Sequence, residues 1–278
     1  LLLTIGDPDR PATLQSGKAL RENIWLKGEP TLSTLFPILT GEEVSDIAIE
    51  NIALEGNRGN NQNLDGNHAG CIFFQDCNRI AIRRVIARNY NGDGMSWQVC
   101  HDVTVEDCHS HGHAGLGLHP GSGSQRSRMQ RNVCEDNDIG IFFCWGVRFS
   151  VAEGNVLRNN RGSGISIGHR DNDNLVRDNQ VEGSGKVGLL FRRESVAGFH
   201  AQRTRVEGNR ILDTGGEEGI GIDIRGETGP AEIVNNQVRE RRGPAKRTGI
   251  RLEAGVRGIR LEGNRVEGFA VPVLDLRG

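Results

Sequence analysis

The sequence is poor in aromatic residues and in proline, and it has no long apolar run. Aromatic side chains make up 5% of the 278 residues, with a single tyrosine, and there are eight prolines. No apolar run exceeds a handful of residues, so no stretch could cross a membrane as a helix. Few prolines and few aromatics beside abundant glycine indicate many tight turns, and argue against a collagen-like or disordered chain.

The chain also lacks a surplus of charge of either sign. It has 34 basic and 36 acidic residues, a net charge of −2, which excludes a nucleic-acid binder held by bulk charge. Only four basic residues are lysines, a bias that reflects genome composition rather than mechanism. Six cysteines fit either redox compartment at this length. The chain is long enough to bury a large core in one domain, or at most two.

Glycine is in excess, and it recurs with a period. The 39 glycines are about twice the usual share. A glycine followed by alternating apolar residues recurs every 21 to 33 residues, at Gly70, Gly94, Gly115, Gly140, Gly164, Gly188, Gly221 and Gly249. Each unit adds two more short alternating runs, such as residues 80–82 and 85–87. Three short period-two strands per unit predict a three-sided coil that stacks on the next coil.

Asparagine supplies a second register in phase with the first. It recurs just before the third run of each unit, at Asn132, Asn155, Asn179, Asn209, Asn236 and Asn264, with Arg84 and Cys108 in the same register earlier. Stacked asparagines can hydrogen-bond the corner backbone and one another, which satisfies buried polar groups at a sharp bend. The two registers together predict an all-β solenoid.

With these strand starts and the Gly-Asn pairs at 154–155, 208–209 and 263–264, the sequence resembles the right-handed parallel β-helix proteins of the pectin-lyase-like superfamily, roughly over residues 44–276. The resemblance implies an all-β, right-handed parallel β-helix of about eight to nine coils over residues 44–278. Residues 1–43 lack the repeat and are expected to cap the first coil, with a short helix near residues 17–23. The superfamily includes pectate and alginate lyases, polygalacturonases, mannuronan epimerases and phage tailspikes, and no subfamily is assigned.

One face of the solenoid is expected to carry the site. If the first and third residues of each first strand point inward, the second and fourth point outward. The outward second positions are then Ile72, Ser96, Gly117, Phe142, Ser166, Leu190, Asp223 and Arg251. The outward fourth positions are Phe74, Gln98, His119, Cys144, Gly168, Arg192, Arg225 and Glu253. The resemblance implies that a glycan groove runs along this sheet.

Four residues are predicted to be catalytic. His119 and His169 are suited to proton transfer near neutral pH, and we expect them two coils and ~10 Å apart, on opposite sides of one sugar ring. Asp93 and His113 lie in the turns before two successive strands, where a carboxylate would orient an imidazole and raise its pKa. For each of the four, the alternative is a turn residue that bonds only to the backbone.

The predicted substrate-binding residues lie on the same face: Gln98, Trp145, Asp171, Arg192, Arg193 and Arg225. Arginine suits bidentate binding of a carboxylate, whose charge must be neutralised before the neighbouring C–H becomes acidic. The alternative for the arginines is a salt-bridged ladder with Glu194, Asp223 and Glu253. Trp145 is expected to be a platform on which a sugar ring stacks.

No metal site is predicted. Calcium is left open as a cofactor, with Asp171, Asp173 and Glu194 as its oxygen ligands. The histidines at 101, 109 and 111 lack the spacing of a zinc motif. Cys77 and Cys100 align one coil apart and are expected to stack as thiols in preference to forming a disulfide.

Motifs of single subfamilies match only in part. Residues 91–94, Asn-Gly-Asp-Gly, resemble the first element of the polygalacturonase motif, but the paired carboxylates of inverting hydrolysis are missing. Residues 118–121, Leu-His-Pro-Gly, are loosely similar to the Asp-Pro-His-Asp of mannuronan epimerases.

The expected function is that of a carbohydrate-active enzyme on a uronate-containing polysaccharide or oligosaccharide, by lyase or C5-epimerase chemistry. The alternatives are a glycoside hydrolase using Asp93 with Asp138 or Asp171, and a non-catalytic glycan-binding or structural solenoid. We expect neither nucleic acid nor a membrane as a partner, and the oligomeric state is open. The resemblance implies an extracellular or periplasmic location, although no signal peptide is visible in the sequence.

Overall fold

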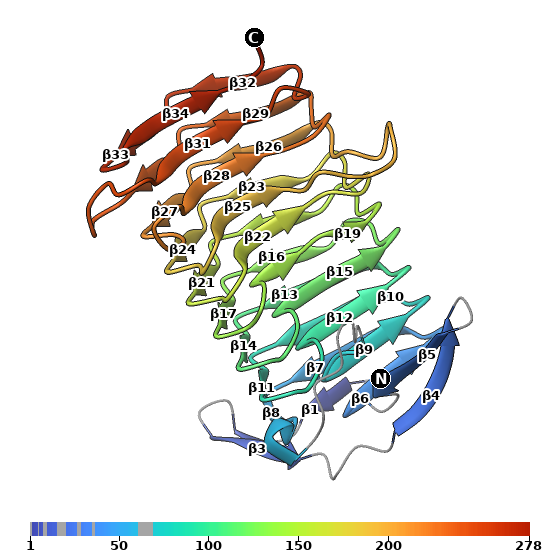
Figure 1. Ribbon diagram of the computed structural model, residues 1–278. Helices are drawn as coiled ribbons and strands as arrows, with labels where there is room; N and C mark the ends of the chain where they lie inside the picture. Colours follow the sequence, from blue (N-terminus) through green and yellow to red (C-terminus); the bar gives the residue numbers. More distant parts are fainter. Residues whose placement is uncertain are drawn as a thin grey trace.

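The chain winds into a rod of stacked coils, each with three short strands (Figure 1). The computed structural model describes residues 37–60 and 69–278, together with the backbone of five strands within residues 1–36. From residue 37 on, each strand pairs in parallel with the strand on the same side of a neighbouring coil, so three long sheets run the length of the rod. The predicted right-handed parallel β-helix is confirmed.

Sheet 1 contains the first strand of each coil and is the sheet expected to carry the site. In pairing order it comprises β6 (Leu39–Glu42), β9 (Ile72–Gln75), β12 (Met95–Gln98), β15 (Leu118–Ser122), β18 (Ile141–Phe142), β22 (Ser163–Ile167), β25 (Val187–Phe191), β28 (Ile220–Ile224), β31 (Thr248–Leu252) and β34 (Val271–Asp275). A short strand off this path, β19 (Cys144–Trp145), also pairs with β15.

Sheets 2 and 3 contain the second and third strands of each coil. Sheet 2 comprises β1 (Leu2–Thr4), β7 (Ser45–Glu50), β10 (Asn78–Arg83), β13 (His101–Glu106), β16 (Arg128–Gln130), β20 (Val151–Glu153), β23 (Leu175–Arg177), β26 (Thr204–Glu207), β29 (Ala231–Val234) and β32 (Ile259–Glu262). Sheet 3 comprises β2 (Gly6–Asp7), β3 (Arg10–Gln15), β8 (Ile52–Glu55), β11 (Ile86–Arg88), β14 (His109–His111), β17 (Val133–Glu135), β21 (Val156–Arg158), β24 (Gln180–Glu182), β27 (Arg210–Leu212), β30 (Gln237–Arg239) and β33 (Arg265–Glu267).

The first 36 residues contribute strands rather than the predicted helix. β4 (Arg21–Leu26) and β5 (Glu29–Thr34) form a separate antiparallel pair. The helix expected near residues 17–23 lies partly outside the described residues. For residues 21–23 the prediction of a helix is wrong, because they are part of strand β4. In the described part of the chain the helical element is the 3₁₀ turn η1 (Arg58–Asn60), and no helix there could span a membrane. The division at residue 43 stays a prediction, although β6 already pairs with β9 in sheet 1.

A stack of glycines explains why the repeat begins with this residue. Gly94, Gly117, Gly140, Gly164, Gly188, Gly221 and Gly249 occupy equivalent positions just before or within the sheet 1 strands, and a Cβ at any of them would lie 2.5–2.8 Å from a carbonyl oxygen of the next coil. Only glycine allows coils to approach this closely. The inward residues that follow, such as Met95, Leu118, Ile141 and Ile165, are fully buried and stack into one continuous core.

The structure corrects the predicted register in two coils. Gly117, not Gly115, joins the glycine stack, so Leu118 is the first inward residue of its strand, not the third, and His119 takes the second position beside Ser96, not the fourth. In the first unit Ile72 and Phe74 pair with Met95 and Trp97 and are buried, so their predicted outward orientation is wrong. The segment Gly-Leu-Gly-Leu satisfies both registers locally, and only pairing with neighbouring strands selects one.

The predicted asparagine ladder is confirmed. From Asn155 to Asn264, each Oδ1 accepts hydrogen bonds from the backbone N–H and the side-chain amide of the asparagine one coil earlier, beginning with Asn132, at 2.8–3.0 Å. Cys108 continues the ladder, and Val85, not Arg84, takes the position before it. All six cysteines are free, and the Cys77 N–H faces the Cys100 sulfur at 3.4 Å, so the two stack as thiols.

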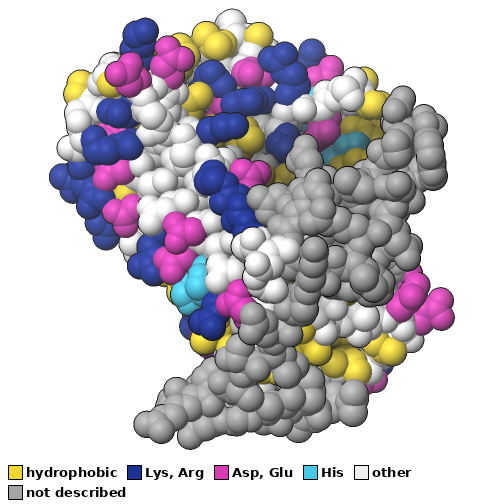
Figure 2. Space-filling model, turned by 60° about the horizontal axis from the view of Figure 1, so that its bottom comes forward, with side chains coloured by type: hydrophobic (Ala, Val, Ile, Leu, Met, Phe, Trp, Pro, Cys, Tyr) yellow, Lys and Arg dark blue, Asp and Glu magenta, His cyan; other side chains and the backbone are white. Residues whose placement is uncertain are grey.

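Charged side chains of both signs intermingle on the surface of the rod, as the face in Figure 2 shows. Many of them pair between successive coils: Asp46 with Arg79, Asp102 with Arg126 and Asp173 with Arg203, each at 2.6–2.8 Å. Such exposed pairs contribute little to stability individually. They do cancel local charge, in keeping with the small net charge.

Candidate functional site

A buried carboxylate and an imidazole form the centre of the site. β15 presents His119 on the outer face of sheet 1, and Asp93 lies in the turn before β12. Asp93 Oδ2 is 2.7 Å from His119 Nδ1, and Asp93 Oδ1 accepts a hydrogen bond from the Leu116 N–H at 3.0 Å. Asp93 is 3% exposed and His119 8%. The pair therefore places a proton on Nδ1 and leaves Nε2, 3.3 Å from the Cys144 carbonyl oxygen, as the nitrogen that can exchange a proton.

Phe142 separates this pair from a half-buried arginine. The His119 ring meets the Phe142 ring edge-on at 5.4 Å, and the Arg192 guanidinium lies over the same ring at 4.3 Å. Arg192 donates hydrogen bonds to Ser166 Oγ at 2.9 Å and to the Phe143 carbonyl oxygen at 2.8 Å. Arg192 thus holds a fixed positive charge on this face, with much of its donor capacity taken up by the protein.

Asp171 lies beneath this face and not on it. Its Oδ1 accepts the Val147 N–H and its Oδ2 the Gly168 N–H, both at 2.9 Å, and Arg192 Nη2 lies 3.4 Å from Oδ2. Burial raises the pKa of Asp171 to about 7, although Arg192 and the two N–H groups oppose that rise. Because the side chain has no exposed surface, its predicted contact with substrate is wrong. Its hydrogen bonds instead hold the turn that carries His169.

His169 supports an exposed tryptophan. The Glu194 carboxylate accepts a hydrogen bond from the His169 backbone N–H at 2.7 Å, and its other oxygen lies 3.0 Å from His169 Nδ1. The His169 ring stacks on Trp145 at 4.5 Å with an interplanar angle of 22°, and Trp145 is 57% exposed. The exposure leaves Trp145 free to act as the predicted sugar platform.

The two predicted proton-transfer histidines do not flank one sugar ring. Strand register places His119 in line with Ser166, and His169 lies three residues further along the chain. The two histidines are therefore two coils apart and also offset along the sheet, because His169 lies in the turn after β22. The error follows from the register of residues 115–118.

His113 does not join the site. Its side chain is fully buried, with Nδ1 accepting the Tyr90 N–H and Nε2 facing the Ala87 carbonyl oxygen, both at 3.1 Å. Burial lowers the pKa of His113 to about 3. The ring is a corner residue between coils, so the structure fits the alternative interpretation of a residue that bonds only to the backbone.

The remaining predicted binding residues are engaged with neighbours. Gln98 is buried and donates to Ser96 Oγ at 3.1 Å. Arg225 pairs with Asp223 at 2.6 Å, and the exposed Arg193 pairs with Glu253 at 2.8 Å. The two arginines thus form the salt-bridged ladder that was the alternative to carboxylate binding.

The carboxylates of this face do not assemble into an ion site. Asp171 is buried, Asp173 pairs with Arg203 and Glu194 with His169, so the three predicted calcium ligands are separately engaged. Among residues 37–60 and 69–278, no group of three or more His, Cys, Asp or Glu residues could hold a metal ion. The geometry does not favour the hydrolase alternative either, because Asp93 is bonded to His119 and Asp171 is buried. Asp138 is exposed at the same corner as Asp93, two coils further on, where its backbone N–H donates to the Gly115 carbonyl oxygen.

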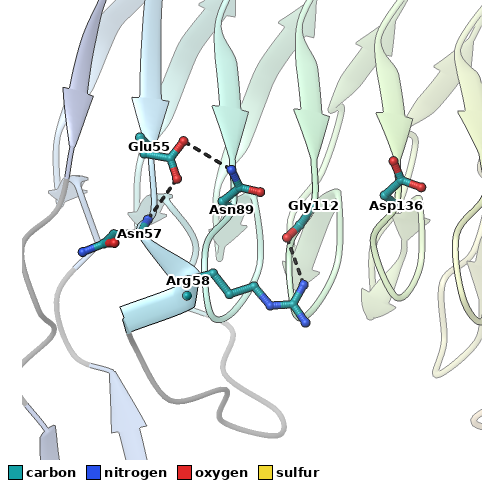
Figure 3. Close-up of a pocket in the computed structure, with 7 residues that line it drawn as sticks. Glu55, Asn57, Arg58, Asn89, Gly112 and Asp136 are labelled. Atoms are coloured by element: carbon teal, nitrogen blue, oxygen red, sulfur yellow. Dashed lines mark hydrogen bonds between the residues drawn. The ribbon is translucent and has the colours of Figure 1, made fainter.

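Away from this face, a hollow lies at the corner that follows sheet 3 (Figure 3). Glu55 accepts hydrogen bonds from the Asn57 N–H at 3.2 Å and the Asn89 amide at 3.3 Å, and Arg58 donates to the Gly112 carbonyl oxygen at 3.0 Å. Several of the polar groups that line it are thus bonded to one another. We place no function there.

Sequence reasoning missed the residues that surround the predicted ones. The alternating pattern predicts outward side chains for Ser166 and Phe142 but no role in the site. Nothing in the pattern distinguishes Arg148, Arg170 or Phe199. Phe199 packs edge-on against His169 at 5.0 Å, and Arg170 lies over Phe199 at 4.1 Å. A signal existed for Arg170, which directly follows the predicted His169, but Phe199 comes from a longer loop with no repeat pattern.

Comparison with known proteins gives the same fold and a recurring activity. A family model described as "Right handed beta helix region" matches residues 50–198. Mannuronan C5-epimerase AlgE5 of Azotobacter vinelandii is 27% identical over 186 residues, which is 66% of this chain and 16% of that protein. The chain therefore spans less than a fifth of the length of this curated relative.

Solved structures of similar shape include two named epimerases. The A-module of mannuronan C-5 epimerase AlgE6 of Azotobacter vinelandii gives a TM-score of 0.65 at 16% identity, over 84% of this chain and 72% of that one. The periplasmic alginate epimerase AlgG gives 0.57 at 13% identity, over 86% of this chain and 71% of that one. At these identities the structural likeness supports the fold alone.

Proposed function

The chain belongs to the right-handed β-helix family, and from that premise we propose that it acts on a uronate-containing polysaccharide, by C5-epimerase or lyase chemistry, at sheet 1 around His119. The observation that carries the proposal is the Asp93–His119 pair on the face where Arg192 holds a positive charge. The names of the similar proteins, mannuronan and alginate epimerases, favour epimerisation.

The proposed chemistry begins with removal of a proton from C5 of a uronate unit. His119 accepts that proton at Nε2 while its Nδ1–H stays hydrogen-bonded to Asp93, whose negative charge stabilises the imidazolium that forms. The electron pair left at C5 is delocalised into the adjacent carboxylate, and nearby positive charge stabilises the resulting dianion. Delivery of a different proton, from water, to the opposite face inverts C5, and His119 then releases the proton it took to solvent. Alternatively, loss of the O4 substituent, protonated as it leaves, gives a C4–C5 double bond.

Turnover of mannuronan by His119 and Asp93 variants tests this proposal. We expect H119Q to lower turnover by about 100-fold or more, the typical contribution of a positioned base. D93N should lower it by roughly 10- to 100-fold, because it disturbs the orienting hydrogen bond. Proton NMR in D₂O reports C5 inversion and exchange, and ultraviolet absorbance reports the double bond of elimination.

His111 offers a matched control, since it lies in β14 of sheet 3, away from the proposed site. H111Q should retain wild-type turnover. Equal turnover in H119Q and H111Q would contradict the role of His119. Wild-type protein that binds uronans but turns over none would favour the glycan-binding solenoid.

The proposal extends to partner and location. The partner is a polysaccharide whose repeating unit carries a carboxylate. Since the similar AlgG is named as a periplasmic enzyme, we place this activity outside the cytoplasm, in the periplasm or the extracellular space.

A further inference from the structure

An open hollow lies beside Trp145 in the turn that follows sheet 1. It measures about 400 Å³, within the range of small-molecule sites, and two stacked turn glycines, Gly123 and Gly146, form its floor. A Cβ on Gly123 would meet nothing within 4 Å, and one on Gly146 would meet only the Gly123 backbone, at 4.0 Å. The floor is therefore bare backbone, open above to a ligand.

One ring face of Trp145 is available to that hollow. The other face is covered by His169, which belongs to the following coil. The second face is on the side of the preceding coil, where Trp145 is paired with Ser122, a small residue that also lines the hollow, and the next residue is Gly123. An exposed indole with one supported and one bare face suits stacking against the apolar face of a sugar.

Two arginines line the same hollow, Arg148 and Arg170. Both are exposed, and within the described part of the chain neither forms a salt bridge. Asp173 is close enough to Arg148 to feel its charge, but its carboxylate is paired with Arg203. The Arg170 guanidinium lies flat over Phe199, which in turn packs on His169. A stacked guanidinium is fixed in place through its face and keeps the N–H donors of its edge for a carboxylate. This contrasts with Arg192, Arg193 and Arg225, whose donors are engaged.

The hollow lies one residue beyond a backbone group that contacts the proposed catalytic residue. The Cys144 carbonyl oxygen lies 3.3 Å from His119 Nε2, and Trp145 is the next residue in the chain. A polymer that presents one unit to His119 would therefore place a neighbouring unit over Trp145.

We propose that this hollow is a binding subsite for one uronate unit of the polymer, whose ring stacks on Trp145 and whose carboxylate is bound by Arg148 and Arg170. The inference rests on the proposed function for its polymer, and it adds the residues that select an acidic sugar. It predicts that acidic oligosaccharides bind more tightly than neutral ones, and that added salt weakens their binding.

Calorimetric binding of a mannuronate hexamer and of a neutral β-1,4-linked glucose hexamer tests the subsite. We expect R148Q/R170Q to weaken mannuronate binding about tenfold or more and to flatten its salt dependence, since charge-assisted hydrogen bonds are lost. W145A should weaken it by about fivefold or more through loss of stacking. R257Q, which changes an exposed arginine in a distant coil, is the matched control and should bind as wild type.

The outcomes separate this inference from the proposed function. Unchanged mannuronate affinity in R148Q/R170Q, an equal loss in R257Q, equal affinity of the wild type for both hexamers, or no mannuronate binding would each overturn the subsite. If H119Q still abolishes turnover in that case, the catalytic proposal stands alone. If R148Q/R170Q loses affinity while no uronan is turned over by the wild type, the subsite stands and the catalytic proposal fails.

Discussion

His113 does at the corner of its coil what asparagine does in the next two coils. Its Nδ1 accepts a backbone N–H and its Nε2–H donates to a carbonyl oxygen of an earlier strand. Asn137 and Asn160 use Oδ1 and Nδ2 for the same two bonds. The sequence interpretation as a catalytic residue failed because a histidine in a turn gives no sign of which groups the stacked coils bring to it.

Replacing His113 with asparagine is expected to remove an acid sensitivity while keeping the corner bonds. Because burial lowers the pKa of His113 from 6.5 to about 3, the folded protein binds this proton less readily than the unfolded chain. Its stabilising contribution is complete above pH 6.5 and falls as the pH drops toward 3, by up to about 1.4 kcal/mol per pH unit. Urea unfolding of wild type and H113N between pH 7 and 4.5 should show a difference in stability that shifts in favour of H113N as pH falls. If the stabilities of wild type and H113N change with pH in parallel, His113 is not the source of the acid sensitivity.

At the scale of one repeat unit, the glycine that begins it is required by contact between coils. Its neighbour across the stack is the carbonyl oxygen of the equivalent position, too close for any side chain. The period of these glycines and the alternation after them could be read from the sequence because both are local. The choice between Gly115 and Gly117 could not, since both begin an alternating apolar pattern.

Gly188→Ala is expected to destabilise the protein by about 1–3 kcal/mol, the usual cost of overpacking. The new Cβ would lie 2.6 Å from the Gly221 carbonyl oxygen and 2.4 Å from a methyl group of Ile211. Gly216→Ala is the control, because a Cβ there meets nothing within 4 Å, and its effect should stay within about 0.5 kcal/mol. Denaturant midpoints measure both variants, and similar midpoints for the two would argue against the close-packing explanation.

At the scale of the whole molecule, the rod has no single centre of stability. Each sheet strand pairs only with the coils before and after it, so stability is close to a sum of neighbouring contacts. The proposed site spans β12, β15, β18, β19 and β22, with paired coils on both sides. Interior placement gives the Asp93–His119 pair and the Trp145 hollow a rigid support.

Hydrogen exchange should therefore vary along the rod. In β34, Val271 and Val273 are exposed, and β34 pairs with one neighbour, β31. We expect its amides to exchange well before those of β22 and β25, whose residues are nearly all buried and paired on both sides. Mass spectrometry of peptic peptides measures this gradient, and uniform protection from β22 to β34 would show that the rod opens as one unit.

The amino-acid sequence by itself determined the coil, its three sides and the asparagine ladder, because glycine spacing and period-two alternation are local properties repeated in every unit. Only the tertiary structure decided which side chains meet. His119 reaches Asp93, 26 positions earlier, because their coils stack. Stacking likewise buries Asp171, engages Arg192 and places the exposed Arg148 and Arg170 beside two turn glycines. Burial and pairing depend on neighbouring coils that lie more than twenty residues away in sequence, and no local pattern specifies them.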